Sequence, residues 1–569
     1  MDRLKRILIG ICIVFLFPAL TLAQEVEKFQ QEQRQLEEEK LLRERIEEKK
    51  EEPVIEEPPP EIRAPLAAGE KVLIKKINVT GVTLIPEQEI QGIISPFENK
   101  EIGLEEMQKV VDLITDAYRK RGYVTSRAYL PPQKIQNEVM EIMAVEGVIG
   151  DVEIKGNRFF RTSVLRKAIR LQKGEHFDYK ELRRNLSKLN EHPDRNVKAV
   201  LAPGKEAGAT DIVLEVTDNL PLHLRLDYDN YASRYVDKNR YTGVLSHNNI
   251  FGFDDIVSLQ YQTSDGQDYT LIALRYLLPV SSRTKLGFSI SKSALELGRE
   301  FKSLEARGKS RNYSIFAIHD LIKKDDYAVT LNAGFDYLDS FNFQLGDEQS
   351  RDRLRVVKLG ADLDASDSWA RGGRTIISPE IGLGLADFMG GLEEKDSRAS
   401  RVGSGGKFIK YSLNLIRLQN MPLSSMLLWK SQAQTSPYTL TASQQFQLGG
   451  ISNVRGYPSG EYVGDRGISS SWEWLIPPYF LPKDILVPFS KAKFYDALKL
   501  VAFYDWGYVN LRQPQPGERK NSTLRSLGWG IRFNLPENFS IRADFAWSVK
   551  KTPSDGDRFH PWVQVSKEF

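Results

Sequence analysis

The chain has 569 residues, which is long enough for three or four ordinary domains. Lysine and arginine number 79 against 76 for aspartate and glutamate, and this net charge of +3 gives no support for nucleic acid as a partner. Beyond the N-terminus no run of about 18 apolar residues occurs, which excludes a membrane-spanning helix. A transmembrane barrel passes this test, because its strands expose only alternate residues to lipid.

Residues 1–23 have the three parts of a secretory signal peptide. A basic start precedes an apolar stretch over 7–17, and Ala23 completes a small-residue cleavage site before Gln24. The alternative, an N-terminal membrane anchor, needs a longer apolar run. The single cysteine, Cys12, lies inside this segment, so we expect the exported chain to carry no disulfide and no cysteine metal ligand.

Two segments of unusual composition follow. Residues 24–50 consist almost entirely of Glu, Lys, Arg, Gln and Leu, which favours a charged helix. Such a helix is either solvated or docked in a polar cavity, and its loose apolar stripe leaves both interpretations open. Residues 51–70 contain five prolines, which predicts a semi-rigid, extended linker.

Residues 71–147 and 148–218 form two similar units. Each opens on an alternating apolar pattern that ends in glycine, and Gly81 and Gly156 are 75 residues apart. In both units the apolar periodicity predicts one strand, two helices and two strands, enough for one small core. The helices are expected over 86–94 and 104–121 in the first unit and over 162–171 and 179–190 in the second, with later strands over 123–129, 139–145, 197–201 and 212–216.

From residue 219 to residue 569 the pattern changes to repeated strict alternation. Apolar or aromatic residues alternate with charged residues and glycines over 222–229, 329–337, 528–535 and 541–549. A soluble sandwich explains any single strand equally well. The repetition over about 350 residues, with Trp and Tyr at strand ends, favours a transmembrane β-barrel of about 16 antiparallel strands.

No catalytic motif accompanies these elements. The chain lacks the H-E-x-x-H, G-x-S-x-G and G-x-x-x-x-G-K-[ST] patterns, so neither an enzyme nor a nucleotide-driven pump is expected. His223 and His247 are interpreted as ordinary polar residues of a strand and a turn. We expect no cofactor and no metal ion.

Four motifs, in order, resemble a known family. The first is 114–133, which contains Arg121-Gly122-Tyr123 and Leu130-Pro131-Pro132-Gln133, together with the strand ending Val145-Glu146-Gly147. The second is Asp229-Asn230-Tyr231 with 248–254. The third is Asn453-Val454-Arg455-Gly456-Tyr457, and the fourth is Phe503-Tyr504-Asp505-Trp506-Gly507. Together they resemble the two-partner secretion transporters (TpsB), the haemolysin secretion/activation proteins of the ShlB/FhaC type. That family belongs to the superfamily that joins POTRA domains to a barrel and includes BamA.

The resemblance implies a location and a mechanism. The two small units would be periplasmic POTRA domains, which catch the unfolded N-terminal secretion domain of a large exported partner. That partner would thread through an outer-membrane barrel and fold outside, without nucleotide. The resemblance also implies a pore-plugging role for the helix over 24–50, although its charge density is unusual for one, and contact with outer-membrane lipid and the barrel-assembly machinery.

The same resemblance assigns the candidate site residues. The loop near 449–467 would fold into the barrel, so that Arg455 meets Asp505, which the alternation already places on the inner face. The loop-tip motif is Val454, Arg455, Gly456 and Tyr457; the wall motif is Phe503, Asp505 and Gly507; the client-binding candidates are Tyr123, Arg127, Leu130, Pro131 and Gln133; and Phe569 is the C-terminal assembly signal. Two alternatives remain, an outer-membrane insertase of the same superfamily and a passive solute porin.

Overall fold

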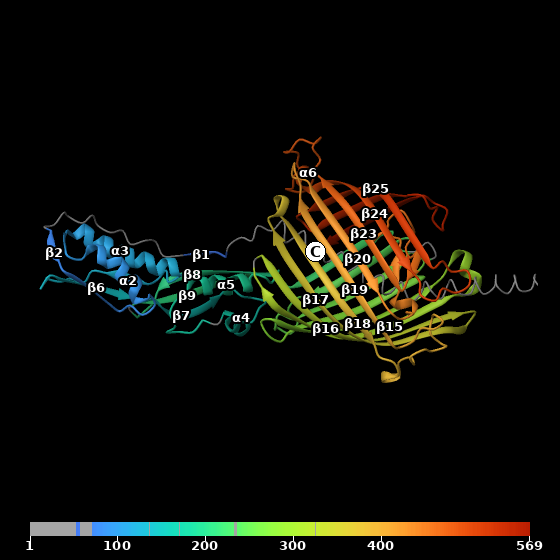
Figure 1. Ribbon diagram of the computed structural model, residues 1–569, viewed down its shortest axis with the longest axis horizontal. Helices are drawn as coiled ribbons and strands as arrows, with labels where there is room; N and C mark the ends of the chain where they lie inside the picture. The colour runs from blue at the N-terminus through green and yellow to red at the C-terminus, as the bar shows by residue number, and fades with distance from the viewer. Residues whose placement is uncertain are drawn as a thin grey trace, which may run out of the picture. The chain divides into compact units, whose positions relative to one another are not determined.

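The computed structural model describes residues 53–56 and 71–569, apart from 136, 170, 207, 233–235 and 325. The expected signal peptide, the expected charged helix and most of the expected linker therefore lie outside the described residues. The described chain divides into two compact units, one ending at Pro221 and the other beginning at Leu222 (Figure 1).

The first POTRA-like region is a small α+β module. It contains β2 (Val72–Ile74), β3 (Lys76–Thr80), α2 (Glu87–Ile94), a 3-10 turn (Ser95–Phe97), β4 (Lys100–Ile102), α3 (Leu104–Arg121), β5 (Arg127–Tyr129) and β6 (Val139–Val145). The sheet order is β3-β6-β5, and the pair β2–β4 forms a separate ribbon that the sequence did not reveal. The strand expected over 123–129 is shorter than predicted, because the Ser126 N–H turns back to the Tyr123 carbonyl at 3.1 Å.

The second module contains β7 (Val148–Lys155), α4 (Thr162–Ile169), α5 (Tyr179–Leu189), β8 (Arg195–Pro203) and β9 (Ala209–Asp218). Its sheet order is β1-β8-β9-β7. The added strand β1 (Ile55–Glu56) comes from the stretch expected to be linker and lies parallel to β8, with Ile55 opposite Ala199. Each module encloses its own core of buried apolar side chains, centred on α3 in the first and on α5 in the second.

The expected barrel of 16 antiparallel strands is confirmed. Every strand pairs with its neighbours, and β10 pairs with β27 to close the wall, as a membrane-embedded sheet requires. The strands are β10 (Leu222–Asp229), β11 (Arg240–His247), β12 (Ile256–Ser264), β13 (Tyr269–Pro279), β14 (Thr284–Glu296), β15 (Arg307–Lys323), β16 (Tyr327–Gln344), β17 (Asp347–Asp367), β18 (Gly373–Gly384), β19 (Phe408–Asn420), β20 (Met426–Thr435), β23 (Arg466–Ile476), β24 (Leu498–Asn510), β25 (Asn521–Leu535), β26 (Phe539–Ser548) and β27 (Phe559–Glu568).

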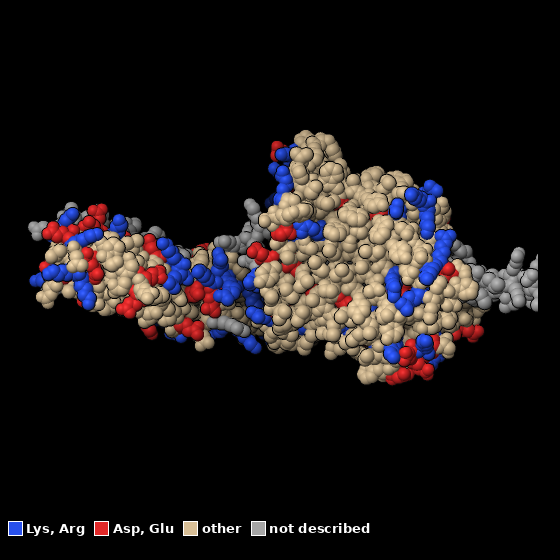
Figure 2. Space-filling view, viewed as in Figure 1, with Lys and Arg blue, Asp and Glu red and all other residues tan. Residues whose placement is uncertain are grey.

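The alternation along these strands separates two faces. Large apolar side chains stand exposed on the outside of the wall, among them Leu226, Leu259, Ile272, Leu413, Tyr504, Leu527 and Trp529. The space-filling view shows this outer wall as a largely uncharged band (Figure 2). Buried polar and charged side chains, such as Gln262, Asn312, Lys410, Ser469 and Asp544, occupy the intervening inward positions. This arrangement is that of a lipid-facing barrel with a polar interior.

Candidate functional site

The stretch between β20 and β23 folds back against the barrel wall. Two short strands, β21 (Phe446–Leu448) and β22 (Tyr462–Gly464), pair at its base, with Phe446 opposite Gly464. The tip between them, residues 449–461, carries Arg455, whose exposed fraction is only 1 %. The loop expected to fold inward is therefore seated on the inner wall.

Arg455 meets Asp505 through a complete set of charge-assisted contacts. Its Nε lies 2.9 Å from Asp505 Oδ2, its Nη2 lies 2.6 Å from Oδ1, and its backbone N–H donates to Oδ2 at 3.1 Å. This planar, bidentate fit is one that lysine cannot reproduce. The Arg455 guanidinium also lies over the Phe503 ring, 3.4 Å from its centroid. The loop tip and the wall motif expected from the sequence are thus in contact.

A second acid, which was not expected from the sequence, also forms an ion pair with Arg455. Glu473 on β23 has no exposed surface and accepts from Arg455 Nη1 at 2.8 Å. The only signal for it was its place between Trp472 and Trp474, because alternation puts a charge flanked by two lipid-facing aromatics on the inner wall. Asp544 on β26 lies 3.5 Å from the same guanidinium.

Further cations balance these buried acids. Arg532 bridges Glu473 at 3.1 Å and Asp544 at 2.7 Å. Arg542 binds Asp544 at 2.9 Å, and Lys430 binds Glu473 at 3.2 Å. We call these seven groups the wall network: Lys430, Arg455, Glu473, Asp505, Arg532, Arg542 and Asp544. The network joins strands β20, β23, β24, β25 and β26, so the loop is held by five strands and not by a single ion pair.

Two glycines allow the loop to approach the wall so closely. A Cβ on Gly456 would lie 2.7 Å from the backbone nitrogen of Ser548, and one on Gly507 would lie 2.2 Å from the Leu448 side chain. Val454 and Tyr457 are fully buried in a cluster with Leu448, and the Tyr457 hydroxyl donates to the Val549 carbonyl at 3.2 Å. Each residue of both motifs therefore has a packing or charge-pairing role.

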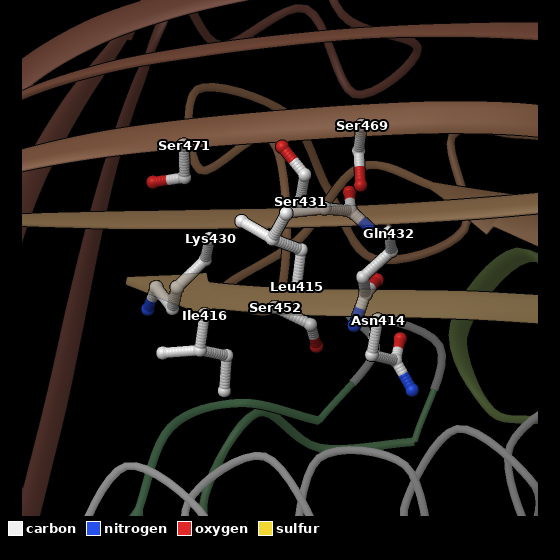
Figure 3. Close-up of a pocket in the computed structure, with 10 residues that line it drawn as sticks. Asn414, Leu415, Ile416, Lys430, Ser431, Gln432, Ser452, Ser469 and Ser471 are labelled. Carbon is white, nitrogen blue, oxygen red and sulfur yellow. The ribbon is translucent and has the colours of Figure 1, made fainter. Parts of the chain in front are cut away.

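A small pocket adjoins the wall network. It is lined by residues of β19, β20 and β23 and by Ser452 and Asn453 of the loop (Figure 3). Lys430 and Ser471 belong both to this lining and to the Arg455 surroundings, since Ser471 accepts from Arg455 Nη2 at 2.9 Å. The pocket and the surroundings of Arg455 therefore share two residues of the barrel wall.

A second buried pair fixes the base of the same loop. Arg401, in the connection between β18 and β19, binds both carboxylate oxygens of Asp465 at 2.8 Å. Asp465 also accepts from the backbone N–H groups of Leu440 and Arg512, so three connections meet at one carboxylate. Neither residue was expected from the sequence, because both lie in loops with no periodic pattern.

The five POTRA residues expected to bind client differ in their accessibility. Tyr123 and Leu130 pack against the core of the first module, and Pro131 is half-buried beside them. The Gln133 side chain bonds to the Glu141 backbone, donating to its carbonyl at 2.7 Å and accepting from its N–H at 2.8 Å. The Gln133 side chain thereby hydrogen-bonds to β6 in the way that a neighbouring strand would. Arg127 is the exposed residue among the five.

Glu146, which belongs to the Val145-Glu146-Gly147 motif, acts as a structural clamp. Its Oε1 accepts from the N–H groups of Thr83 and Leu84 at 2.7 Å and from the Tyr118 hydroxyl at 2.9 Å. Burial acts to raise its pKa, but the hydrogen bonds from Thr83, Leu84 and Tyr118 outweigh burial and hold the pKa below its ordinary value. Burial and this same contact raise the pKa of Tyr118. The carboxylate thus ties α3 and the turn before α2 to the end of β6.

The C-terminus closes the barrel. Phe569 exchanges backbone hydrogen bonds with Leu224, at 2.9 and 3.3 Å, directly beyond the last pair of β10 and β27. Phe569 is 65 % exposed, on the outside of the wall.

Comparison with known proteins identifies this arrangement. The sequence profile of the family described as haemolysin secretion/activation protein ShlB/FhaC/HecB matches residues 208–533, more than half of the chain. The chain belongs to this family. A profile for POTRA domains of the ShlB type matches residues 72–147, and a POTRA profile described as surface antigen variable number repeat matches 147–199.

Individual proteins agree with the family. The heme/hemopexin transporter protein HuxB of Haemophilus influenzae is 24 % identical over 84 % of each chain. The solved structure of CdiB from Escherichia coli has a TM-score of 0.65 and 20 % identity, covering 95 % of this chain and 98 % of its own. BamA of Haemophilus ducreyi, lacking its POTRA domains 1–3, has a TM-score of 0.55 and 15 % identity, covering 88 % and 100 %.

Family membership fixes the location and the class of activity. The protein is an outer-membrane transporter of the two-partner secretion family, with POTRA domains in the periplasm. The family consists of transport proteins and works with secreted exoproteins. Among the described residues, no helix has the length and apolarity to cross a membrane, and no cluster of potential metal ligands occurs.

Proposed function

We propose that this protein captures an unfolded partner exoprotein through its POTRA domains in the periplasm and passes it through the barrel to the cell surface. The partner is a large secreted protein with an N-terminal secretion domain. Membership of the secretion family carries the proposal. The names of relatives, a heme/hemopexin transporter among them, concern their own partners, and the proposal for this chain names only the class of cargo.

The barrel interior supports passage of an unfolded chain. Its inward positions are polar along most strands, and an extended polypeptide needs partners for the amides that it cannot pair internally. The wall network seats the loop tip on one side of the interior, on β20 and β23–β26. In this proposal the network is a fixed support that defines the pore, and the protein has no catalytic activity of its own.

The POTRA modules offer two surfaces for client capture. On the first, Tyr129 and Met143 lie opposite each other on β5 and β6, both about two-fifths exposed, next to Arg127. On the second, β8 accepts β1 along its edge through only two paired residues. If β1 leaves this edge, another extended segment can take its place through the same main-chain hydrogen bonds. We propose that client segments dock on these two surfaces.

Two further partners follow from the proposal. The exposed apolar belt of the barrel contacts outer-membrane lipid, and the barrel-assembly machinery reads the C-terminal strand with Phe569 during biogenesis. The insertase alternative is not favoured, because the profile of the secretion family covers residues 208–533, which include most of the barrel, and the likeness to BamA, at 15 % identity, is one of fold. A porin has no use for POTRA domains.

The test is secretion by the intact cell. Deletion of the gene should remove one large protein from the culture medium. The full-length gene should restore that protein, whereas a variant lacking Lys71–Asp218 should not, even though its barrel retains heat-modifiable gel mobility. An unchanged medium would refute export. Loss of other outer-membrane barrels, with normal secretion of the large protein, would instead favour the insertase.

A further inference from the structure

The connection between β23 and β24 departs from the other connections at its end of the barrel. Those connections run from the three residues 324–326 to the eight residues 248–255, whereas this one spans 477–497. Short periplasmic turns are the rule for outer-membrane barrels. The segment stands out sideways from the wall beside α6 (Phe494–Ala497) (Figure 1), at the end where β10 begins and therefore on the periplasmic side.

The connection has a defined conformation. Val487 donates to the Ala492 carbonyl at 2.8 Å and Phe494 donates to the Ile485 carbonyl at 2.9 Å, so residues 485–494 form a small hairpin. The Ser490 hydroxyl donates to Glu537 at 2.7 Å, which ties the tip region to the neighbouring turn. On the other flank the Tyr479 hydroxyl donates to the Leu423 carbonyl.

This 485–494 hairpin presents an apolar tip. Phe489 is completely exposed, at 110 % of its reference area, and Leu486 is 57 % exposed. Phe489 also has a φ of 64°, a left-handed conformation that a bulky side chain adopts only when its surroundings impose it. Leaving such a ring in water forgoes the favourable free energy of burying it. A fixed backbone that holds an aromatic ring outward needs something to cover that ring.

The barrel surface from which the hairpin extends indicates what covers the Phe489 ring. The hairpin grows out of β23 and β24, whose outward residues Trp474 and Tyr504 are 49 % and 41 % exposed on the lipid-facing wall. Phe480 in the same connection and Leu423 in the adjacent turn are 69 % and 77 % exposed. The projection is thus an extension of the apolar belt.

Cations accompany these apolar side chains. Lys483 and Lys491 are exposed, and the Lys483 ammonium lies 5.6 Å from the centroid of the Tyr495 ring. In the space-filling view the projection is mostly uncharged, with lysine and arginine atoms and a few acidic atoms gathered along one side (Figure 2). Aromatic and aliphatic tips beside lysines are the composition of a segment lying in a membrane interface, with ammonium groups at the headgroup phosphates.

We propose that the 485–494 hairpin is a membrane anchor, which inserts Phe489 and Leu486 into the periplasmic leaflet of the outer membrane while Lys483 and Lys491 bind phospholipid headgroup phosphates. The hairpin joins the two strands that carry Glu473 and Asp505. Anchoring it therefore holds in place the strand pair against which Arg455 is clamped. The inference rests on the outer-membrane location and not on the export of a client.

The test places a label at the tip of the full-length protein. Cys12 is the only cysteine, so Phe489→Cys in a Cys12→Ser background gives one labelling site. The matched control is Leu345→Cys, also an exposed apolar residue, in the turn between β16 and β17 at the opposite end of the barrel. Leu486→Cys serves as a second site should the first variant not insert, with insertion judged by heat-modifiable mobility.

In phospholipid vesicles, we expect nitroxide-labelled lipids to quench a fluorophore at 489 at least about three-fold more than one at 345, and aqueous iodide to show the reverse order. Equal iodide quenching at both sites, with no quenching by the lipids, would overturn the anchor. A blue shift of the label's emission that occurs in native outer membranes but not in pure phospholipid vesicles would also overturn the anchor, in favour of a protein partner. Secretion is scored on the same variants, so a failed anchor with normal secretion leaves the export proposal standing.

Discussion

The two units of this chain bury opposite kinds of side chain. In the second POTRA module the leucines are inside, and Leu182 and Leu186 have no exposed surface. In the barrel Leu527 is 50 % exposed, whereas Glu473 and Asp505 have none. Leucine is buried in one unit and exposed in the other because the first unit folds in water and the second has hydrocarbon outside its wall.

The difference shows what holds each unit together. The POTRA modules rely on contiguous apolar cores, and most of their charged residues lie on the surface, some in exposed pairs such as Lys173–Asp151. The barrel gains its integrity from closed strand pairing, and on its inner wall the wall network lies among smaller apolar clusters. Burial of charge is normally costly, and it is tolerated here because every member of the network has a partner of opposite sign.

The largest expected effect comes from removing the central cation of the wall network. Arg455→Ala leaves Asp505 fully buried without its bidentate partner and deprives Glu473 and Asp544 of one cation. We expect the barrel to lose about 3–5 kcal/mol of unfolding free energy, and secretion to fall with it. Urea unfolding followed by heat-modifiable gel mobility measures the first, and the amount of partner in the medium measures the second.

The matched control is an arginine in an exposed pair. Arg307 lies 3.2 Å from Glu296, with both side chains about half exposed, and Arg307→Ala should cost no more than about 1 kcal/mol. If the two variants unfold at the same urea concentration, the wall network does not support the barrel in the way that its burial implies.

The second prediction compares two neighbours on one strand. Leu413 on β19 faces outward and is 41 % exposed, and Asn414 faces the interior pocket. Leu413→Arg should cost about 2–4 kcal/mol if it lies at the depth of the hydrocarbon, whereas Asn414→Arg should cost about 1 kcal/mol or less. Unfolding in vesicles measures both. A reversed order would mean that the assignment of the two faces is wrong.

The barrel and its closure could be predicted from the sequence because alternation is a local signal repeated many times. The segments expected over 222–229 and 528–535 lie in β10 and β25. The meeting of Arg455 with Asp505 was expected only from the family resemblance. Nothing in the spacing of a glycine-rich loop and a strand 50 residues later dictates that they touch.

Contacts between distant segments account for what the sequence did not reveal. Strand β1 consists of two residues, Ile55 and Glu56, and pairs with β8 more than 140 residues further along the chain. So short a strand carries no periodicity. Arg401 and Asp465 meet for the same reason, since loops bring together residues that no local pattern relates. Alternation did place Arg532 and Asp544 on the inner face, but their bonding required the strand register.

The smallest expected effect concerns Glu146, the acid that acts as a clamp in the first POTRA module. Since the pKa of Glu146 in the folded state lies below its ordinary value, its stabilising contribution is fully present above the pKa of an unfolded glutamate, about 4.3. That contribution is lost as the pH falls through the lower, folded pKa.

Glu146→Gln keeps the shape but removes the charge that four donors face. It should cost about 1–2 kcal/mol at neutral pH and should remove this acid-dependent loss. Hydrogen exchange of the α3 amides in the full-length protein, corrected for the intrinsic pH dependence of exchange, measures both effects. Glu101→Gln, an exposed glutamate on β4, is the control and should leave α3 protected at every pH. Equal protection of α3 in the Glu146→Gln and Glu101→Gln proteins at neutral pH would show that the carboxylate contributes nothing beyond its shape.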